Sequence, residues 1–189
     1  EKLAKERSDV ETDIIPQQMP IFSLAVKAID WVANQKTDLS EEIKQYIMND
    51  LLCYRESEDT KLQEHQSKYW DPWLSWASIE FDFELKIANG VIPINQAQSN
   101  TTLLMQVISQ MSIWNFMCFI RATTLTGSAI LALAFIRKQL TPNTLFSVAY
   151  LDELYQIATW GEDGEAKARH VAVKNELHDL SDFLRLAEE

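Results

Sequence analysis

The chain has 189 residues and a formal net charge of −11, with 17 lysines and arginines against 28 aspartates and glutamates. This length is typical of a single domain that can bury a sizeable core. The charge has the wrong sign for phosphate groups, which excludes nucleic acid and anionic membrane as partners. Four glycines and five prolines are few for a β-sandwich or barrel.

The acidic residues lie on both sides of a central block. Residues 87–139 contain three bases and no acid, whereas residues 37–86 and 140–189 carry net charges of −7 and −6. With −1 for residues 1–36 and +3 for the central block, the four values add up to −11. This distribution is typical of an apolar core wrapped by solvated helices, and a basic partner would meet the flanks.

Cys53 and Cys118 lie far apart without CxxC spacing, and each has apolar neighbours. They are interpreted as free core thiols, which favours a reducing compartment. The sequence shows no signal peptide, transit peptide or lipidation motif. Because residue 1 is Glu and not Met, we expect the natural start to lie upstream.

The first predicted elements are two helices separated by a break. Residues 1–12 are typical of the end of a charged helix, which residues 13–16 (DIIP) terminate. Pro20 then takes the favoured first-turn position of a second helix. We expect this helix to be at least half buried, because its apolar face is wide. The face contains Ile21, Phe22, Leu24, Ala25, Ala28, Ile29 and Trp31.

A third helix is predicted to begin at Thr37 or Asp38, either of which can cap it. Residues 55–59 are polar and predict a loop, and residues 61–69 predict a short helix after it. Apolar residues recur along the third helix at a spacing that indicates amphipathicity. They are Leu39, Ile43, Ile47 and Leu51, and Tyr54 extends the stripe.

Asp71 and Pro72 form a cap followed by a first-turn proline, so a new helix is predicted to begin there. Trp70, Trp73 and Trp76 are spaced by three. A tryptophan stripe of this kind is more typical of a core than of a binding surface.

Residues 83–94 are the one stretch in which the pattern allows strand. Apolar residues alternate there, and residues 89–90 (NG) are a turn signal, so a short β-hairpin is an option. The next helix is predicted to be capped by Ser99 or Asn100.

The stretch that the other elements are expected to surround is residues 112–138. Apart from Arg121 it has no charge before Arg137, and no helical face is consistently polar, as expected for a helix buried on all sides. Its polar interruptions leave no apolar run near the roughly 20 residues that a membrane span requires. We therefore predict a buried central helix, bent or broken near Gly127, and no membrane insertion.

The last two helices are predicted around Gly161. Residues 141–142 (TP) again give a cap with a first-turn proline, and Gly161 ends that helix. Glu162, Asp163 and Glu165 begin the final one, where acids complement the helix dipole. The inward-facing residues are Leu145, Val148, Leu151, Tyr155 and Ala158 on the first helix, and Ala166, His170, Val173, Leu177, Leu180 and Leu184 on the second.

A search for catalytic chemistry finds no known signature. Phosphate-binding glycine loops and the GxSxG elbow are missing, and the three histidines match no HExxH pattern. His170 lies on an apolar stripe, which favours a hydrogen-bonded histidine at the core edge over a metal ligand. We therefore expect no catalytic residue, no metal, no cofactor and no small-molecule substrate.

One helix flank gives the candidate binding residues. Glu153, Gln156 and Trp160 fall at i, i+3 and i+7, so a carboxylate, an amide and an indole share one side. A solvated edge with one packed tryptophan explains this spacing. The functional alternative is a recognition edge, because Trp is enriched at binding hot spots and a carboxylate favours an Arg or Lys partner.

Five groups of residues, in order along the chain, resemble the motifs of a known family. They are residues 15–20 (IPQQMP), 50–55 (DLLCYR), 70–77 (WDPWLSWA), 126–134 (TGSAILALA), and 151–153 (LDE) with 160–163 (WGED). The chain is thus similar to the ATP12 family, the ATP synthase assembly chaperones that attend the α subunit of the catalytic head. It departs from the family at residues 6–7, which are Glu-Arg where relatives commonly have Glu-Trp.

The resemblance implies a mainly α fold and a binding function without catalysis. Family members have a small β-rich N-terminal domain before a helical one, so residues 1–189 are expected to be the helical chaperone domain, with residues 1–12 ending the connecting helix. The β-rich domain is then absent from this sequence. The resemblance also implies that the protein holds the unassembled α subunit until the β subunit replaces it, in the mitochondrial matrix or the bacterial cytoplasm.

The candidate partner-binding residues are Glu153, Gln156, Trp160, Glu162 and Asp163, which we expect to meet a basic or amide-rich patch on the α subunit. Two alternatives remain. One is a helical adaptor for another protein. The other is an enzyme that uses Asp152, Glu153, Glu162 and Asp163 around a divalent metal.

Overall fold

The structure is a computed structural model that describes residues 19–90 and 92–188. The predicted helix over residues 1–12 and its end at residues 13–16 lie outside the described residues. The helices are α2 (Pro20–Lys27), the π-helix η2 (Ala28–Val32), α3 (Ala33–Met48), the 3₁₀ turn η3 (Leu51–Cys53), α4 (Thr60–Phe81), α5 (Gln98–Ser109), α6 (Ile113–Thr126), α7 (Ala129–Ile136), α8 (Pro142–Ala149), α9 (Leu151–Trp160) and α10 (Gly164–Ala187). The two strands are β1 (Tyr54–Arg55) and β2 (Ala88–Asn89).

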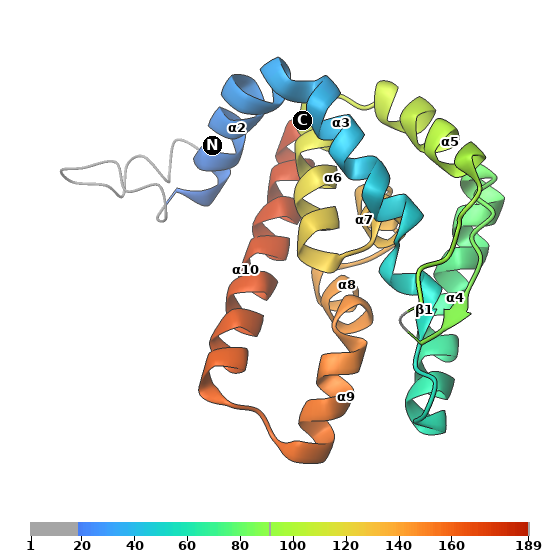
Figure 1. Cartoon of the computed structure of the whole chain (residues 1–189). Helices are drawn as coiled ribbons and strands as arrows, with labels where there is room; N and C mark the ends of the chain where they lie inside the picture. Colours follow the sequence, from blue (N-terminus) through green and yellow to red (C-terminus); the bar gives the residue numbers. More distant parts are fainter. Residues whose placement is uncertain (1–18, 91, 189) are drawn as a thin grey trace.

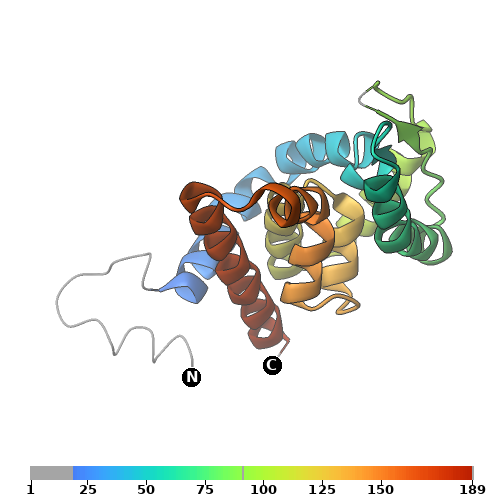
Figure 2. The same cartoon turned by 90° about the horizontal axis from the view of Figure 1, so that it is seen from below.

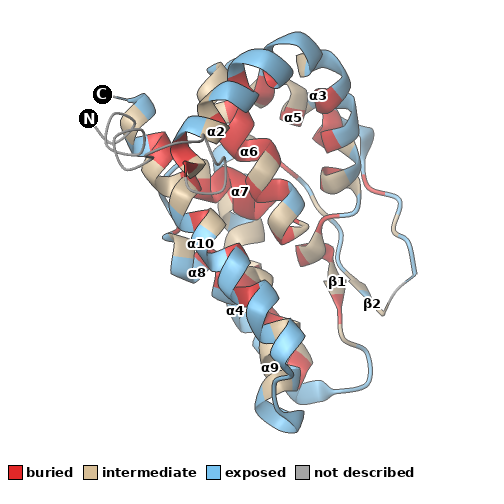
Figure 3. Cartoon of the chain, turned by 90° about the vertical axis from the view of Figure 1, so that its left-hand side faces the viewer, coloured by how far each residue is buried: buried red, intermediate tan, exposed pale blue. Residues whose placement is uncertain are grey.

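The predicted central stretch forms α6 and α7, which the other helices surround (Figure 1). Every residue of α7 from Ala129 to Phe135 is buried, and Figure 3 shows buried residues concentrated in these two helices. The chain breaks between them at Gly127, whose φ of 69° ends α6 in the left-handed region. Ser128 then caps α7 by accepting a hydrogen bond from Leu131 N. The mainly α fold around a buried centre and its break are confirmed.

The helix that begins at Pro20 runs through η2 into α3, so the predicted start of a third helix at Thr37 or Asp38 is wrong. The chain bends instead at Gln35, where φ is −122° and ψ is 18°. The wide π turn keeps residues spaced by four, such as Leu24, Ala28 and Val32, on the buried side.

The buried face of this long helix is narrower than predicted. Phe22, Ile29 and Trp31 are exposed, because only one side of α2 and η2 packs against the core. α3 ends at Met48, so Leu51 lies in η3 and Tyr54 in β1 and not on the predicted helical stripe.

Residues 60–81 form one helix, α4, so the predicted new helix at Asp71 is wrong. The N-cap is Asp59, whose carboxylate accepts hydrogen bonds from Lys61 N and Leu62 N. A proline inside a helix costs about 3 kcal/mol, so tertiary contacts must compensate for Pro72. Trp70 supplies one, because its side chain is buried and its indole N–H donates to Val148 O at 2.9 Å.

The hairpin that the sequence pattern allows within residues 83–94 does not form among the described residues. β2 pairs with β1 in parallel, with Tyr54 opposite Ala88 and Arg55 opposite Asn89. Gly90 does adopt a positive φ of 81°, but the chain leaves this turn without an adjacent return strand. The buried Arg55 likewise belongs to β1 and not to a solvated loop.

α5 begins at Gln98 after Ala97 and has no side-chain cap, so Ser99 and Asn100 do not cap it. Asn100 is buried and bonds the backbone of Glu84. A long-range contact has therefore replaced the local cap that the sequence predicted.

The segment after Thr141 differs from prediction in one respect. Thr141 caps α8 as predicted, by accepting from Thr144 N, but the helix breaks at Tyr150 and α9 follows. The Tyr150 hydroxyl donates to Leu125 O at 3.0 Å, which fixes the break against α6. The break turns the helix, so Ala158, predicted to face inward, is exposed.

Gly161 ends α9 after Trp160, and the acids near residue 163 stand at the start of α10, as predicted. Asp163 is in addition the N-cap of α10, because its carboxylate accepts a hydrogen bond from Ala166 N at 2.8 Å. The loop between the two helices lies at the lower end of the molecule in Figure 1 and therefore faces the viewer in the view from below (Figure 2). The predicted free thiols, Cys53 and Cys118, are buried and unpaired. Across residues 19–90 and 92–188, no helix combines the length and the apolar character needed to cross a membrane.

Candidate functional site

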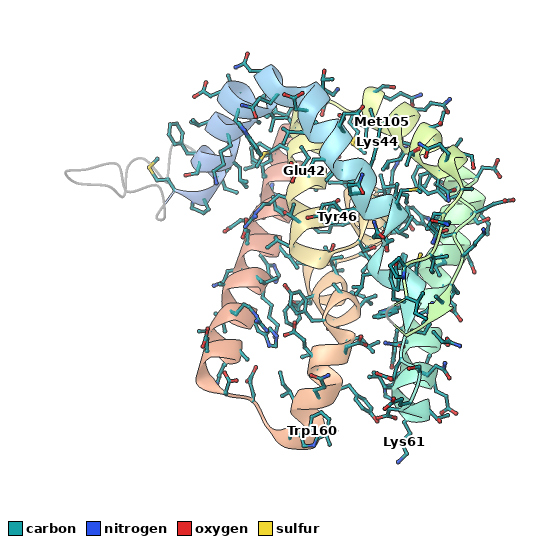
Figure 4. The ribbon with its side chains drawn as sticks, viewed as in Figure 1. Glu42, Lys44, Tyr46, Lys61, Met105 and Trp160 are labelled. Atoms are coloured by element: carbon teal, nitrogen blue, oxygen red, sulfur yellow. The ribbon has the colours of Figure 1, made fainter. Side chains whose placement is uncertain are left out.

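The five candidate binding residues lie along α9 and in the loop that joins it to α10, a surface we call the α9–α10 tip. Glu153, Gln156 and Trp160 come from α9, whereas Glu162 and Asp163 come from the connecting loop. Figure 4 shows Trp160 at the lower end of the molecule, the end at which Lys61 marks the start of α4. Trp160 and the loop with Glu162 and Asp163 thus lie at this end of the molecule, and Glu153 and Gln156 lie further back along α9.

Two of the acids contact one buried histidine. His170 of α10 has its Nε2 atom 3.0 Å from Glu153 Oε2 and its Nδ1 atom 3.2 Å from Glu162 Oε1. Arg169 Nη2 also donates to Glu153 Oε2, at 2.5 Å. A protonated His170 can donate to both carboxylates at once, whereas a neutral imidazole can donate to only one of them.

These contacts position the tip. Because Glu153 belongs to α9 and Glu162 to the loop, their contacts with His170 tie both segments to α10. The predicted role of His170 as a hydrogen-bonded histidine at the core edge is confirmed, since the ring is buried and packs edge-on against Phe146 and Tyr150.

The remaining tip residues face solvent. Trp160 is 77% exposed and Gln156 is exposed as well. Asp163 is also exposed, although one of its oxygens caps α10. The tip therefore presents an indole, an amide and carboxylate oxygens to solvent. The contacts of His170 and Arg169 with Glu153 and Glu162 hold this part of the fold in place.

The sequence alone did not identify the residues that hold the tip in place. Arg169 was not singled out, and His170 was not connected with Glu153 or Glu162. Local spacing offered little signal, because Glu153 and His170 belong to different helices. The acids at the start of α10 were visible, but only the fold shows that the His170 ring lies between one of them, Glu162, and Glu153 of α9.

The four acids of the metal hypothesis do not converge. Asp152 accepts two hydrogen bonds from Gln66 Nε2, at 2.9 and 3.1 Å, and burial raises the pKa of this carboxyl. Glu153 and Glu162 contact His170, and Asp163 caps a helix. Within the described part of the chain, no group of three or more His, Cys, Asp or Glu side chains could hold a metal ion.

The motifs that carry the family resemblance meet inside the fold as polar contacts between distant elements. Asp50, which precedes η3, accepts from Ser128 Oγ at 2.7 Å and from Ile130 N at 3.2 Å. Arg55 Nη2 donates to Asp71 Oδ1 at 2.5 Å, and its guanidinium lies over the Trp70 ring. These motif residues are thus positioned to hold the fold.

The described surface also has hollows and exposed apolar residues away from the tip. Lys44 of α3 and Met105 of α5, labelled in Figure 4, line a hollow of about 400 Å³. A second groove of about 330 Å³ lies between α4 and the β2 segment. Exposed large apolar side chains gather on α2 and η2, and these are Phe22, Val26, Ile29 and Trp31.

Comparisons with known proteins find a family model and solved structures that are similar to this chain. The family model described as "ATP12 chaperone protein" matches residues 1–78. The crystal structure of Atp12 from Paracoccus denitrificans superimposes with a TM-score of 0.92 at 32% identity, covering 97% of this chain and 79% of that one.

Two further solved structures are similar. A point mutant of the Paracoccus denitrificans protein gives a TM-score of 0.93 at 31% identity, covering 97% of this chain and 79% of that chain. A candidate chaperone from Agrobacterium tumefaciens gives 0.84 at 31% identity, covering 91% and 65% of the two chains.

Proposed function

This chain belongs to the ATP12 chaperone family, and from that premise we propose that it binds the unassembled α subunit of the ATP synthase catalytic head and prevents its aggregation until the β subunit replaces it. The observation that carries the proposal is the similarity to Atp12 across 97% of the chain. The family consists of chaperones and not of enzymes. The α subunit as the specific client follows from the motif resemblance.

The physical need for such a protein is clear. A subunit made for a ring exposes a large apolar interface before assembly, often above about 2,000 Å². A chaperone must cover part of that surface and still be displaced, which favours a moderate interface with a few strong contacts.

We propose the α9–α10 tip as one contact with the α subunit. Trp160 offers a large apolar side chain that is not needed to fill the core, since it is 77% exposed. The carboxylates of Glu162 and Asp163 lie beyond it in the connecting loop. A tryptophan close to acids suits a client patch that combines an apolar pocket with Arg, Lys or amide groups.

The proposal also covers the domain organisation of the protein and the compartment in which it acts. Residues 1–189 then constitute the helical chaperone domain of a protein that acts in the bacterial cytoplasm or the mitochondrial matrix. A helical adaptor for another protein is the alternative, and client selectivity separates the two.

Light scattering tests the client. Unfolded α subunit is diluted into buffer with and without this protein, and the β subunit of the same enzyme serves as control. We expect suppressed scattering for α and not for β. Equal suppression of both subunits would indicate an unselective holding protein, and no effect on α would contradict the proposal.

A pair of variants tests the tip. Trp160→Ala should weaken α binding at least about tenfold, because it removes a hot-spot side chain. Ile79→Ala on α4 is the matched control, since Ile79 is 87% exposed and distant in sequence from the tip. Titration calorimetry or surface plasmon resonance gives the affinities. Equal affinities of both variants would exclude Trp160 from the interface.

A further inference from the structure

Residues 83–90 run as an extended segment whose backbone is hydrogen-bonded along one edge. The amide of Asn100 bonds both backbone groups of Glu84, at 3.0 Å to its N–H and 2.8 Å to its carbonyl. The amide of Gln96 bonds Lys86 in the same way, at 2.9 Å for each contact. Further along, Gly90 N donates to Arg55 O at 2.7 Å. The backbone N–H and C=O groups of Glu84 and Lys86, and the N–H of Gly90, therefore point toward the rest of the fold.

The odd-numbered positions form the opposite edge. In an extended chain, successive backbone N–H and C=O groups point to alternate sides. The backbone groups of Leu85 and Ile87 make no hydrogen bond with any described residue. The Ile87 side chain is 49% exposed. This edge has a row of free donors and acceptors, the usual template for pairing with another strand.

The groove of about 330 Å³ lies beside this edge. Arg55 contributes to its wall with a side chain that is only 3% exposed. Its Nη2 atom is bonded to Asp71, but its buried Nη1 atom lacks a hydrogen-bond partner among the described residues. The Arg55 charge is thus paired with Asp71 inside the wall of the groove and is not presented to a ligand. The lining residues are Arg55, Gln63, Glu64, Ser67, Asp71, Ile87 and Asn89.

The charges of the groove lining indicate which kind of ligand would bind there. Its lining contains one cation, Arg55, and two anions, Glu64 and Asp71. Because Arg55 is already paired with Asp71, Glu64 remains as the acid without a described ion-pair partner. An anionic ligand would be repelled there, whereas a Lys or Arg side chain would be attracted.

We propose that the edge at Leu85 and Ile87 binds an extended segment of the client by strand addition, with a basic client side chain directed toward Glu64. The client backbone would pair with the free N–H and C=O groups of this edge. This inference rests on the proposed chaperone function and names the form in which part of the client is recognised.

Hydrogen–deuterium exchange on the whole protein, alone and with α subunit, tests the site directly. We expect slower exchange in peptides covering residues 83–90 when α is bound. Retained binding of α with unchanged exchange in these peptides would overturn strand addition and leave the proposed function intact. Absence of α binding would instead contradict the proposed function, and the strand-addition site would fall with it.

Substitutions separate backbone pairing from apolar contact. Ile87→Pro removes an outward N–H and leaves the inward groups of Lys86 and Ala88 in place, so it should weaken α binding at least about tenfold. Ile87→Ala keeps the N–H and should have a smaller effect. Equal affinity of Ile87→Pro and wild type, with circular dichroism showing both folded, would contradict the proposal.

Charge reversal within one helix supplies the second test. Glu64→Lys should weaken α binding several-fold, because it places a cation where the client's basic side chain is expected. Glu80→Lys is the matched control, since it makes the same charge change on α4 at an exposed position outside the groove lining. Equal effects of both variants would show only a general charge dependence and would overturn the role of the groove.

Discussion

At the scale of single residues, Asp50 joins two parts of the core. Its carboxylate accepts hydrogen bonds from Leu52 N, Ser128 Oγ and Ile130 N, so it contacts the starts of both η3 and α7. The side chain is fully buried, and burial raises its pKa from 3.8 to about 6 although the three hydrogen bonds oppose the shift. Asp50 therefore links η3 to α7, but its burial disfavours the ionised form of the carboxyl group.

The consequence is a defined dependence of stability on pH. Because the pKa is higher in the folded protein, the folded state keeps a proton that the unfolded chain releases between about pH 4 and pH 6. This contribution to stability is complete below about pH 4 and is lost as pH rises through about 6. The change from 3.8 to about 6 corresponds to roughly 3 kcal/mol.

We predict that Asp50→Asn isolates this dependence. The variant should be less stable at pH 4, because its amide N–H₂ faces the Ile130 N–H and leaves a buried donor unpaired, a cost of about 1–3 kcal/mol. As pH rises to 7, the stability advantage of the wild type should shrink by roughly 3 kcal/mol. Urea unfolding at several pH values measures this, and a constant difference would contradict the raised pKa. Asp38→Asn, at an exposed position, is the control.

At the scale of elements, the break between α6 and α7 depends on Gly127. Its φ of 69° lies in the left-handed region, and a Cβ there would meet only Leu51 Cβ at 3.9 Å, an ordinary contact. The need for glycine is therefore one of backbone conformation and not of space. Without this turn, Ser128 could not both cap α7 and donate to Asp50.

We predict that Gly127→Ala lowers the free energy of unfolding by about 1–2 kcal/mol, the cost of a left-handed L-residue. Gly164→Ala is the matched control, because Gly164 begins α10 without a positive φ, and a Cβ added there would meet no heavy atom within 4 Å. It should leave stability unchanged or raise it by up to about 1 kcal/mol. Thermal and urea unfolding measure both, and similar destabilisation by both variants would refute the conformational explanation.

Element boundaries were predictable where a local contact sets them. Thr141 caps α8 as its sequence context predicts, because an N-cap needs only a nearby backbone N–H. The prediction of a cap failed where the residue makes a contact with a distant part of the chain instead. Asp71, which has the sequence signature of a cap, pairs instead with Arg55 of β1, and Asn100 bonds Glu84.

At the scale of the whole molecule, the sequence predicted the buried centre because no helical face of residues 112–138 is consistently polar. The candidate site was predictable only in part. Spacing placed Gln156 and Trp160 on the flank of a helix, but the contacts of Glu153 and Glu162 with His170 require two helices to meet. The free edge at Leu85 and Ile87 could not be predicted either, because no local sequence pattern indicates that β2 pairs in parallel with the distant strand β1.

The last prediction concerns the charge of the molecule. With a net charge of −11 concentrated in the blocks around the acid-free centre, the protein should attract a basic client patch over a distance near the Debye length, about 10 Å at 0.1 M salt. Raising NaCl from about 50 mM to about 500 mM should therefore slow association with α several-fold and change dissociation little.

Stopped-flow binding measures both rates, and two single-charge variants locate the effect. The two variants are Glu165→Gln and Glu42→Gln. Glu165 lies in the first turn of α10 close to the tip, whereas Glu42, which is labelled in Figure 4, lies on the exposed side of α3. If the tip meets the client, Glu165→Gln should reduce the salt dependence of association more than Glu42→Gln. An association rate that rises with salt would show that apolar contacts and not charge guide the encounter, because salt screens attraction between opposite charges.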